Sequence, residues 1–307
     1  SNYNHGELLT YAMNDIGFDC FTLGNHEFDW GAEYITKNMN LKDKVVLSNG
    51  VEMPNIGFGT WQMANDKNTE DVLTFALTHG YSHIDTAMAY GNEEQVGKAI
   101  KNSNRKREEL FITTKLPAEV KDAKEVTKCF ERSLKLMGLD YVDLYLIHAP
   151  WPWEEVGKDY EKENQEIWLE MEKIYKSGKA RSIGVSNFSV DNIKNIMEVA
   201  SIAPQVNQIG YFIGYTEDEI TNYCQANNIL VEAYSPLATG RLNKVEELKE
   251  IAKKYNKTWA QVALKCLQNN TVPLPKTNSK ERALEKIDLD FVITPEDMEY
   301  LRTFKQI

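Results

Sequence analysis

Residues 110–148 read LFITTKLPAEVKDAKEVTKCFERSLKLMGLDYVDLYLIH. Two short runs rich in β-branched and apolar residues, 110–115 and 142–148, enclose a segment with helical periodicity. The apolar residues on one face of that segment are Val126, Phe130, Leu134 and Met137. Gly138 follows them as a stop signal. The stretch therefore predicts a strand, a helix and a second strand, the unit from which parallel sheets are built.

The same alternation continues on both sides of this unit. The predicted strands are NIGFGT (55–60), SHIDTA (82–87), LFITTK (110–115), VDLYLIH (142–148), ARSIGVS (180–186), QVNQI (205–209), ILVEAYS (229–235) and VPLPK (272–276). Their starts recur at roughly 25 to 40 residues, the length of a strand–helix unit. Eight such units predict an α/β fold, a closed parallel (β/α)8 TIM barrel. Before them, KVVLSNGVEMP (44–54) predicts a β-hairpin turning at Asn-Gly, which would close the N-terminal end of the barrel.

Composition excludes several classes of protein. The chain has 307 residues, 42 % hydrophobic and 26 % charged, enough to bury a large core. The net charge of −11 argues against nucleic-acid binding, which needs a basic surface. No apolar run reaches membrane-spanning length, the start SNYNHGELL has no leader-like pattern, and the four cysteines have no metal-type spacing. These features predict free thiols, a cytoplasmic protein, and a monomer or weak homo-oligomer.

Polar residues fall where a barrel places its chemistry, at the carboxyl ends of the strands. Asp85, Lys115 and His148 end three consecutive predicted strands, and Tyr90 lies in the loop after Asp85. Each has an ordinary structural explanation: a helix cap, a strand-end charge, a core histidine and a packing aromatic. Four together at the same end of neighbouring strands favour a catalytic site instead.

Several blocks of the sequence resemble the aldo-keto reductase family. They are HIDTAMAYGNEEQVGKAI, FITTKLP, LYLIHAPWP, KARSIGVSNFS, AYSPLA and PLPKTNSKER, in the family's order. The resemblance covers residues 44–307. It implies NADPH-dependent reduction of aldehydes or ketones to alcohols, with Asp85, Tyr90, Lys115 and His148 as the catalytic tetrad.

The chemistry of carbonyl reduction explains why these four residue types are needed. Hydride addition places negative charge on the carbonyl oxygen, which then needs a proton donor. Tyr90 is the expected acid, and Lys115, oriented by Asp85, is expected to lower the pKa of Tyr90. His148 is expected to hold the substrate oxygen by a hydrogen bond.

The chain has no Gly-x-Gly-x-x-Gly fingerprint in a strand–turn–helix context, so the barrel itself must bind the cofactor. By the resemblance, the nicotinamide contacts are Ser186, Asn187, Gln208 and Tyr211, the last by stacking. Ser235 and Leu237 are expected along the pyrophosphate. The expected adenosine and 2′-phosphate contacts are Lys276, Thr277, Arg282 and Glu285. A lysine and an arginine suit a phosphate and favour NADPH over NADH; the alternative is that KTNSKER is only a solvated helix start.

Two departures from the family pattern stand out. Where the family usually has Glu before the stacking Tyr and His-Pro after it, this chain reads QIGYFIGY, which puts the local loop geometry in doubt. Lys286 replaces an asparagine, which predicts the loss of one amide contact to adenine.

Trp61, Trp151 and Trp153 follow the first and fourth predicted strands and are the expected walls of the substrate pocket. Core packing is the alternative, for Trp153 especially. The pattern does not name the natural substrate. A non-catalytic subunit that binds a nicotinamide nucleotide is the second functional hypothesis.

Residues 1–40 raise a third hypothesis. The run FTLGNHEFDWG (21–31) resembles a metal-binding loop of calcineurin-like phosphoesterases, including 5′-nucleotidases. The other ligand motifs of a dinuclear site are missing from the sequence, which argues against a metal-dependent phosphohydrolase. The prediction is an appended fragment, residues 1–40, that is not an independent domain, followed by the reductase barrel, residues 41–307, with no metal site.

Overall fold

The computed structural model describes residues 44–304. The phosphoesterase-like fragment predicted for residues 1–40 lies outside the described residues, so its resemblance and the domain boundary stay predictions. From Val46 onward the chain forms one compact unit.

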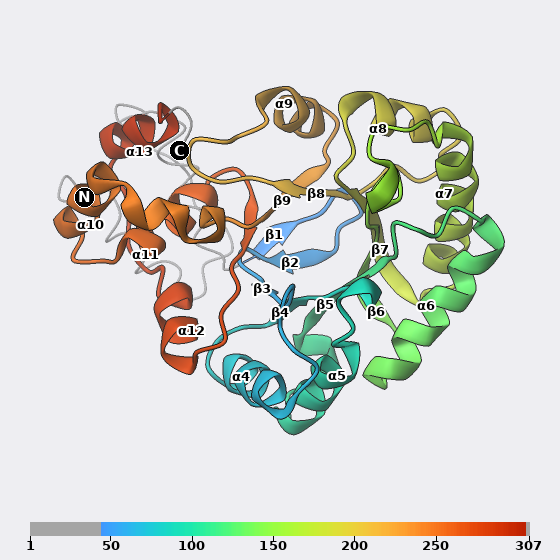
Figure 1. Cartoon of the computed structure of the whole chain (residues 1–307), viewed down its shortest axis with the longest axis horizontal. Coiled ribbons are helices and arrows are strands. Elements are labelled where there is room, and N and C mark those ends of the chain that lie inside the picture. The colour runs from blue at the N-terminus through green and yellow to red at the C-terminus, as the bar shows by residue number, and fades with distance from the viewer. Residues whose placement is uncertain (1–43, 305–307) are drawn as a thin grey trace, which may run out of the picture. The chain divides into compact units, whose positions relative to one another are not determined.

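Eight parallel strands form the barrel at the centre of Figure 1. They are β3 (Phe58–Gly59), β4 (His83–Asp85), β5 (Phe111–Leu116), β6 (Val142–Ile147), β7 (Ala180–Ser186), β8 (Val206–Gly210), β9 (Leu230–Tyr234) and β10 (Val272–Leu274). They follow one another in sequence order around the sheet. Each predicted strand corresponds to one of them, so the predicted (β/α)8 barrel is confirmed.

Backbone hydrogen bonds between the first and last strands close the barrel. The amide of Gly57 donates to the carbonyl of Pro273 at 3.0 Å, and that of Gly59 to the carbonyl of Pro275 at 3.0 Å. A β-carbon at Gly57 would lie 2.5 Å from Cδ2 of Leu274. Glycine at this position therefore leaves room for the side chains of Leu274 and His83, which a larger residue would have to displace.

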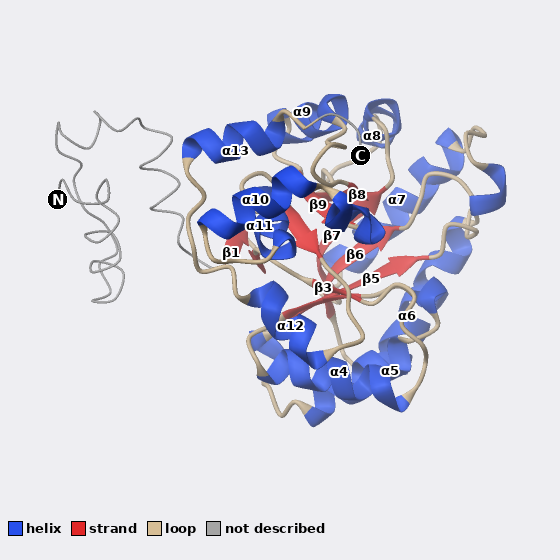
Figure 2. Ribbon diagram, turned by 60° about the vertical axis from the view of Figure 1, so that its left-hand side comes forward, coloured by secondary structure: helices blue, strands red, loops and turns tan. Residues whose placement is uncertain are grey.

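Helices surround the strands (Figure 2). They are α4 (Lys67–Thr78), α5 (Glu93–Asn102), α6 (Ala123–Met137), α7 (Glu161–Lys176), α8 (Val190–Met197), α9 (Asp218–Ala226), α10 (Glu246–Lys254), α11 (Trp259–Leu267), α12 (Lys280–Ile287) and α13 (Pro295–Arg302). The predicted stop of α6 is confirmed, because Gly138 takes the left-handed conformation at its C-terminus. On its buried face Phe130 packs edge-on against Tyr145 of β6, with ring centroids 4.8 Å apart. The core thus lies between the helices and the barrel wall.

The predicted hairpin is confirmed as β1 (Lys44–Val46) paired with β2 (Glu52–Pro54). In its turn, Asn49 Nδ2 donates to the carbonyl of Arg181 at 3.0 Å and to Ser182 Oγ at 3.2 Å. Both acceptors lie at the beginning of β7. The turn therefore lies at the N-terminal end of the barrel, as expected.

A buried ion-pair cluster also marks that end. Asp143, near the start of β6, accepts hydrogen bonds from Arg107 at 2.6 Å, from Arg181 at 2.7 Å and from the amide of Ile112 at 2.9 Å. Its side chain is fully buried. Two guanidinium groups and an amide offset the cost of burying this carboxylate.

Three cysteines lie within the described residues, Cys129, Cys224 and Cys266, and all are free thiols as predicted. No helix in residues 44–304 is long and apolar enough to span a membrane.

Candidate active site

The four candidate catalytic residues meet at the carboxyl end of the barrel. Asp85 is the last residue of β4, Lys115 lies near the end of β5, and His148 follows β6 directly. Tyr90 ends the short 3-10 helix η2 (Met88–Tyr90), in the loop after β4. Because parallel strands present their carboxyl ends on one side, residues 25 to 58 positions apart in sequence come into contact here.

Lys115 is held by a carboxylate and a backbone carbonyl. Its Nζ donates to Asp85 Oδ1 and Oδ2, both at 2.8 Å, and to the carbonyl of Thr86 at 2.9 Å. Burial by itself lowers the pKa of Lys115, but the negative charge of Asp85 and the contact with Tyr90 outweigh it, so the pKa is raised. Lys115 is therefore a charged ammonium in a fully buried position.

Tyr90 lies between this ammonium and the imidazole of His148. Its hydroxyl oxygen is 3.3 Å from Lys115 Nζ and 3.5 Å from His148 Nε2. Burial raises the pKa of Tyr90 above its ordinary value, and Lys115 opposes that rise without cancelling it. Lys115 therefore acts in the expected direction, but desolvation of the phenolate, which the sequence did not reveal, is the larger effect and sets the net direction.

His148 is a neutral imidazole. Burial, with a smaller contribution from the charge of Lys115, lowers its pKa to about 3. Near neutral pH its ring can donate one hydrogen bond and accept another, but it carries no charge. This suits it to orienting a carbonyl oxygen and not to acting as a strong acid.

The candidate nicotinamide contacts lie beside the tetrad, at the ends of β7 and β8. Asn187 Nδ2 donates to the carbonyl of His148 at 3.0 Å and to Ser186 Oγ at 3.1 Å, and its Oδ1 accepts from the Tyr234 hydroxyl at 2.8 Å. Asn187 has a φ of 61°, the left-handed conformation that asparagine tolerates better than most residues. Ser186 Oγ donates to the carbonyl of Gln208 at 2.8 Å.

Gln208 is already engaged with two carboxyl groups. Its Nε2 donates to Asp85 Oδ1 at 2.8 Å and to Glu232 Oε2 at 2.9 Å. An amide nitrogen has two hydrogens, so both are used. If Gln208 contacts a nicotinamide carboxamide, only its Oε1 remains to do so, as an acceptor.

Tyr211 follows β8 and is mostly buried. The residue before it, Gly210, is one of the departures from the family pattern, and the structure supplies a physical reason for a small residue there. A β-carbon at Gly210 would lie 3.3 Å from the Tyr234 ring, so a larger side chain would have to displace that ring.

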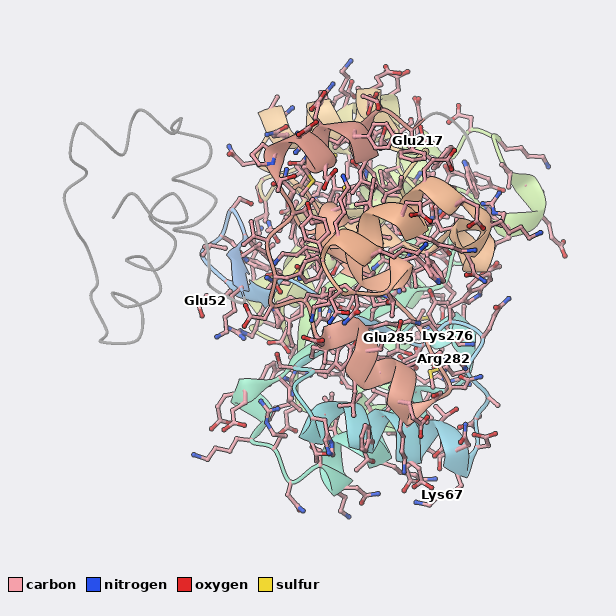
Figure 3. The ribbon with its side chains drawn as sticks, turned by 90° about the vertical axis from the view of Figure 1, so that its left-hand side faces the viewer. Glu52, Lys67, Glu217, Lys276, Arg282 and Glu285 are labelled. Atoms are coloured by element: carbon pink, nitrogen blue, oxygen red, sulfur yellow. The ribbon has the colours of Figure 1, made fainter. Side chains whose placement is uncertain are left out.

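The candidate phosphate contacts lie on the loops after β9 and β10. Ser235 has a φ of 50°, and Leu237, two residues further on, precedes the 3-10 helix η5 (Ala238–Lys244). After β10, Arg282 Nε donates to Thr277 Oγ1 at 3.2 Å, and Ser279 caps α12. Lys276, Arg282 and Glu285 gather around this helix (Figure 3).

These residues fit an anionic cofactor. Arg282 is exposed in the first turn of α12 and Lys276 is partly exposed in the loop before that helix, whose N-terminal backbone amides also favour a phosphate. Glu285 Oε1 accepts from Thr258 Oγ1 at 2.7 Å, so it joins α12 to the start of α11. Lys286 Nζ donates to the carbonyl of Lys276 at 2.7 Å, so the residue that replaces the family asparagine supports the loop.

The three tryptophans of the expected substrate pocket differ in exposure. Trp61 is 50 % exposed and Trp153 is 43 % exposed, whereas Trp151 is half-buried. The ring of Trp153 lies edge-on to His148 at 5.5 Å and to Trp151 at 5.4 Å. The alternative that Trp153 is a core residue is wrong, because nearly half of its surface is open.

Sequence reasoning missed two buried titratable residues inside the barrel, His83 and Glu232. Each lies two residues before a residue at the carboxyl end of its strand, Asp85 and Tyr234. Strand alternation could have found both, since residues i and i+2 face the same side.

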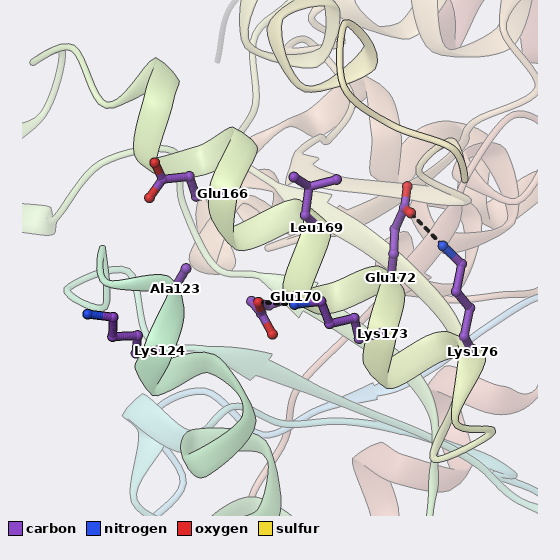
Figure 4. Close-up of a pocket in the computed structure, with 8 residues that line it drawn as sticks. All are labelled: Ala123, Lys124, Glu166, Leu169, Glu170, Glu172, Lys173 and Lys176. Atoms are coloured by element: carbon purple, nitrogen blue, oxygen red, sulfur yellow. Dashed lines mark hydrogen bonds and ion pairs between the residues drawn. The ribbon is translucent and has the colours of Figure 1, made fainter.

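A groove of about 520 Å³, lined by residues of α6 and α7, is separate from the candidate active site (Figure 4). Four of its charged residues form the pairs Lys173–Glu170 and Lys176–Glu172, and no residue that lines it belongs to the tetrad. Within residues 44–304 no three His, Cys, Asp or Glu side chains are grouped to hold a metal ion.

Comparison with known proteins gives a consistent result. The model of the Aldo/keto reductase family matches residues 55–306. Glyoxal reductase of Bacillus subtilis (strain 168) is 44 % identical over 262 residues, which cover 85 % of this chain and 92 % of that protein. Glycerol 2-dehydrogenase (NADP(+)) of Saccharomyces cerevisiae is 37 % identical over 288 residues, covering 85 % and 90 %.

Solved structures agree with the sequence comparisons. An aldo-keto reductase enzyme from a Medee basin deep-sea metagenome library superposes with a TM-score of 0.79 at 41 % identity, covering 85 % of this chain and 94 % of that one. An aldo-keto reductase of Bombyx mori in complex with NADP superposes with a TM-score of 0.77 at 34 % identity, covering 85 % and 92 %.

Proposed function

The chain belongs to the aldo/keto reductase family, and from that premise we propose that it reduces small aldehydes or ketones with NADPH, using Tyr90 as the general acid. One observation carries the assignment of the acid. The Tyr90 hydroxyl lies within 3.5 Å of both the Lys115 ammonium and the neutral His148 ring, at the carboxyl end of the barrel.

Related proteins support the reaction type and the cofactor. The relatives include a glyoxal reductase, an aldehyde reductase and an NADP(+)-dependent glycerol dehydrogenase. A glyoxal reductase acts on a small dicarbonyl compound, so we propose small, reactive aldehydes as the first substrates to test.

NADPH, when bound, supplies the hydride. Each remaining step belongs to residues of this chain. His148 would hold the carbonyl oxygen and align it with the Tyr90 hydroxyl. Tyr90 would give its proton to that oxygen as negative charge develops, and the ammonium of Lys115 would stabilise the phenolate that remains. Asp85 would keep Lys115 charged and pointed at Tyr90.

Residues at the carboxyl ends of β7, β8, β9 and β10, and in the helix α12 that follows β10, would hold the cofactor. Asn187 and Ser186, with Oε1 of Gln208, present polar atoms suited to a carboxamide, and Tyr211 offers a ring for stacking. Ser235 and Leu237 would lie along the pyrophosphate. Lys276, Thr277 and Arg282 would hold the 2′-phosphate, and Glu285 would lie at the adenosine.

A screen of NADPH oxidation tests this proposal. Glyoxal, an unbranched aldehyde, a simple ketone and a 2-ketoacid would each be added to the full chain, and NADPH binding would be measured separately by fluorescence. Turnover of at least one carbonyl compound is expected. NADPH binding without any turnover would instead support the second candidate, a non-catalytic subunit.

A further inference from the structure

Two buried residues that the tetrad chemistry does not use lie directly beneath it. Glu232 is fully buried in β9, and Gln208 is buried beside it in β8. The two residues are register partners in the parallel pairing of these strands. Both side chains therefore enter the barrel interior at the same level.

Gln208 joins Glu232 to the tetrad. Its single side-chain nitrogen donates one hydrogen bond to Asp85 and one to Glu232, at 2.8 Å and 2.9 Å. Asp85 Oδ1 accepts from Lys115 as well as from Gln208. One amide group therefore links Glu232 to the carboxylate that orients Lys115.

The buried position of Glu232 and the charge of Asp85 favour its neutral, protonated form near neutral pH. The facing groups are Asp85 and His83 from β4 and Lys115 from β5, while its partner in β10 is the uncharged Val272. Lys115 is already paired with Asp85. Burial, with the charge of Asp85, raises the pKa of Glu232 to about 8.

His83 does not supply a compensating charge. Burial lowers its pKa to about 3, so its ring is neutral. Glu232 Oε1 lies 3.6 Å from His83 Nε2 and has no hydrogen-bond partner among the described residues. This oxygen is the natural site for the proton of the acid, because Oε2 already accepts from Gln208.

We propose that Glu232 is a positioning residue for the proton donor, acting through Gln208 and Asp85, and that it serves in the protonated state. The inference rests on the proposed function, because it assigns a role within the same reaction. A protonated Glu232 accepts from Gln208 without adding charge. An ionised Glu232 places a second negative charge beside Asp85 and disfavours the Tyr90 phenolate that forms when the proton leaves.

The pH profile of turnover tests this role. The rate of glyoxal reduction by the wild-type chain should fall about five- to tenfold as pH rises through about 8, since a weaker acid transfers its proton more slowly. In Glu232→Gln this inflection near pH 8 in the plot of rate against pH should be absent, because an amide cannot ionise. Glu232→Leu should lose turnover, because leucine cannot accept the hydrogen bond from Gln208. Glu232→Gln should keep turnover, because its amide oxygen can accept that bond. This difference would show that Glu232 acts by hydrogen bonding and not only by filling space.

Glu93 provides a matched control. It is also a buried glutamate with one unpartnered oxygen, but it accepts from Thr114 and makes no contact with Gln208. Glu93→Gln should keep the wild-type inflection.

An infrared titration reads the protonation state without turnover. The wild-type chain should show the carbonyl band of a carboxylic acid that disappears as pH rises through about 8, and Glu232→Gln should lack that band. Turnover with an unchanged inflection in Glu232→Gln, or no such band in the wild type, would overturn the positioning role alone. Failure of the wild type to reduce any carbonyl compound would overturn the proposed function and this role with it.

Discussion

Lys115 Nζ lies 2.8 Å from each carboxylate oxygen of Asp85, so one carboxylate fixes both the charge and the direction of the lysine. In Asp85→Asn the main influence that raises the pKa of Lys115 is lost, while burial continues to lower it. We expect kcat to fall about 100-fold, with activity lost at a lower pH than in the wild type. A pH profile of kcat measures both effects; a profile that keeps its shape would mean that Asp85 does not control the charge of Lys115.

Tyr90→Phe removes one hydroxyl group and keeps the ring that packs edge-on against His148. Turnover should fall by roughly 100- to 10,000-fold, the range for loss of a general acid. NADPH affinity, measured by fluorescence titration, should change little. Turnover close to that of the wild type would refute the assignment of Tyr90 as the acid.

Arg282→Ala should weaken NADPH binding about tenfold or more and NADH binding much less, since only NADPH carries the 2′-phosphate. Dissociation constants for both nucleotides measure this difference. Lys280→Ala is the control, because that lysine lies over the ring of Phe75 at 5.6 Å. Equal losses for the two nucleotides would mean that Arg282 does not contact the phosphate.

Asp143→Asn removes the negative charge that pairs with Arg107 and Arg181 at the N-terminal end of the barrel. We expect the free energy of unfolding to fall by roughly 2 to 4 kcal/mol, with kcat nearly unchanged because the tetrad lies at the other end. Urea unfolding measures the loss. Glu131→Gln, which breaks the exposed pair with Lys179, should cost at most about 0.5 kcal/mol; equal losses would argue against a special role for the buried cluster.

The free energy of unfolding should be greatest at intermediate pH, because Glu232 and His83, both buried inside the barrel, titrate on opposite sides of this range. The pKa of Glu232 is raised, so its contribution is present below about pH 4.5 and is lost as pH rises through about 8. The pKa of His83 is lowered, so its contribution is present above about pH 6.5 and is lost as pH falls through about 3. Thermal unfolding across this range should show a flatter alkaline side in Glu232→Gln; identical curves would exclude Glu232 as the source.

Local sequence determined the order and type of the elements. β-Branched runs, helical periodicity and stop signals such as Gly138 are short-range properties, so each strand and the hairpin at Asn49-Gly50 could be predicted without knowing what they touch. The predicted tetrad could be located for the same reason, because the end of a parallel strand is a position in sequence as well as in space.

The hydrogen bonds and the protonation states of the side chains inside the barrel depend on the tertiary structure. Asp85, Gln208 and Glu232 come from three strands and meet because the closed barrel turns alternate side chains inward. The pKa of Tyr90 is raised despite the nearby Lys115, because the extent of its burial depends on the packing of the whole barrel. Such effects arise between residues far apart in the chain, and the physical reason that sequence alone does not reveal them is that desolvation and charge act through space.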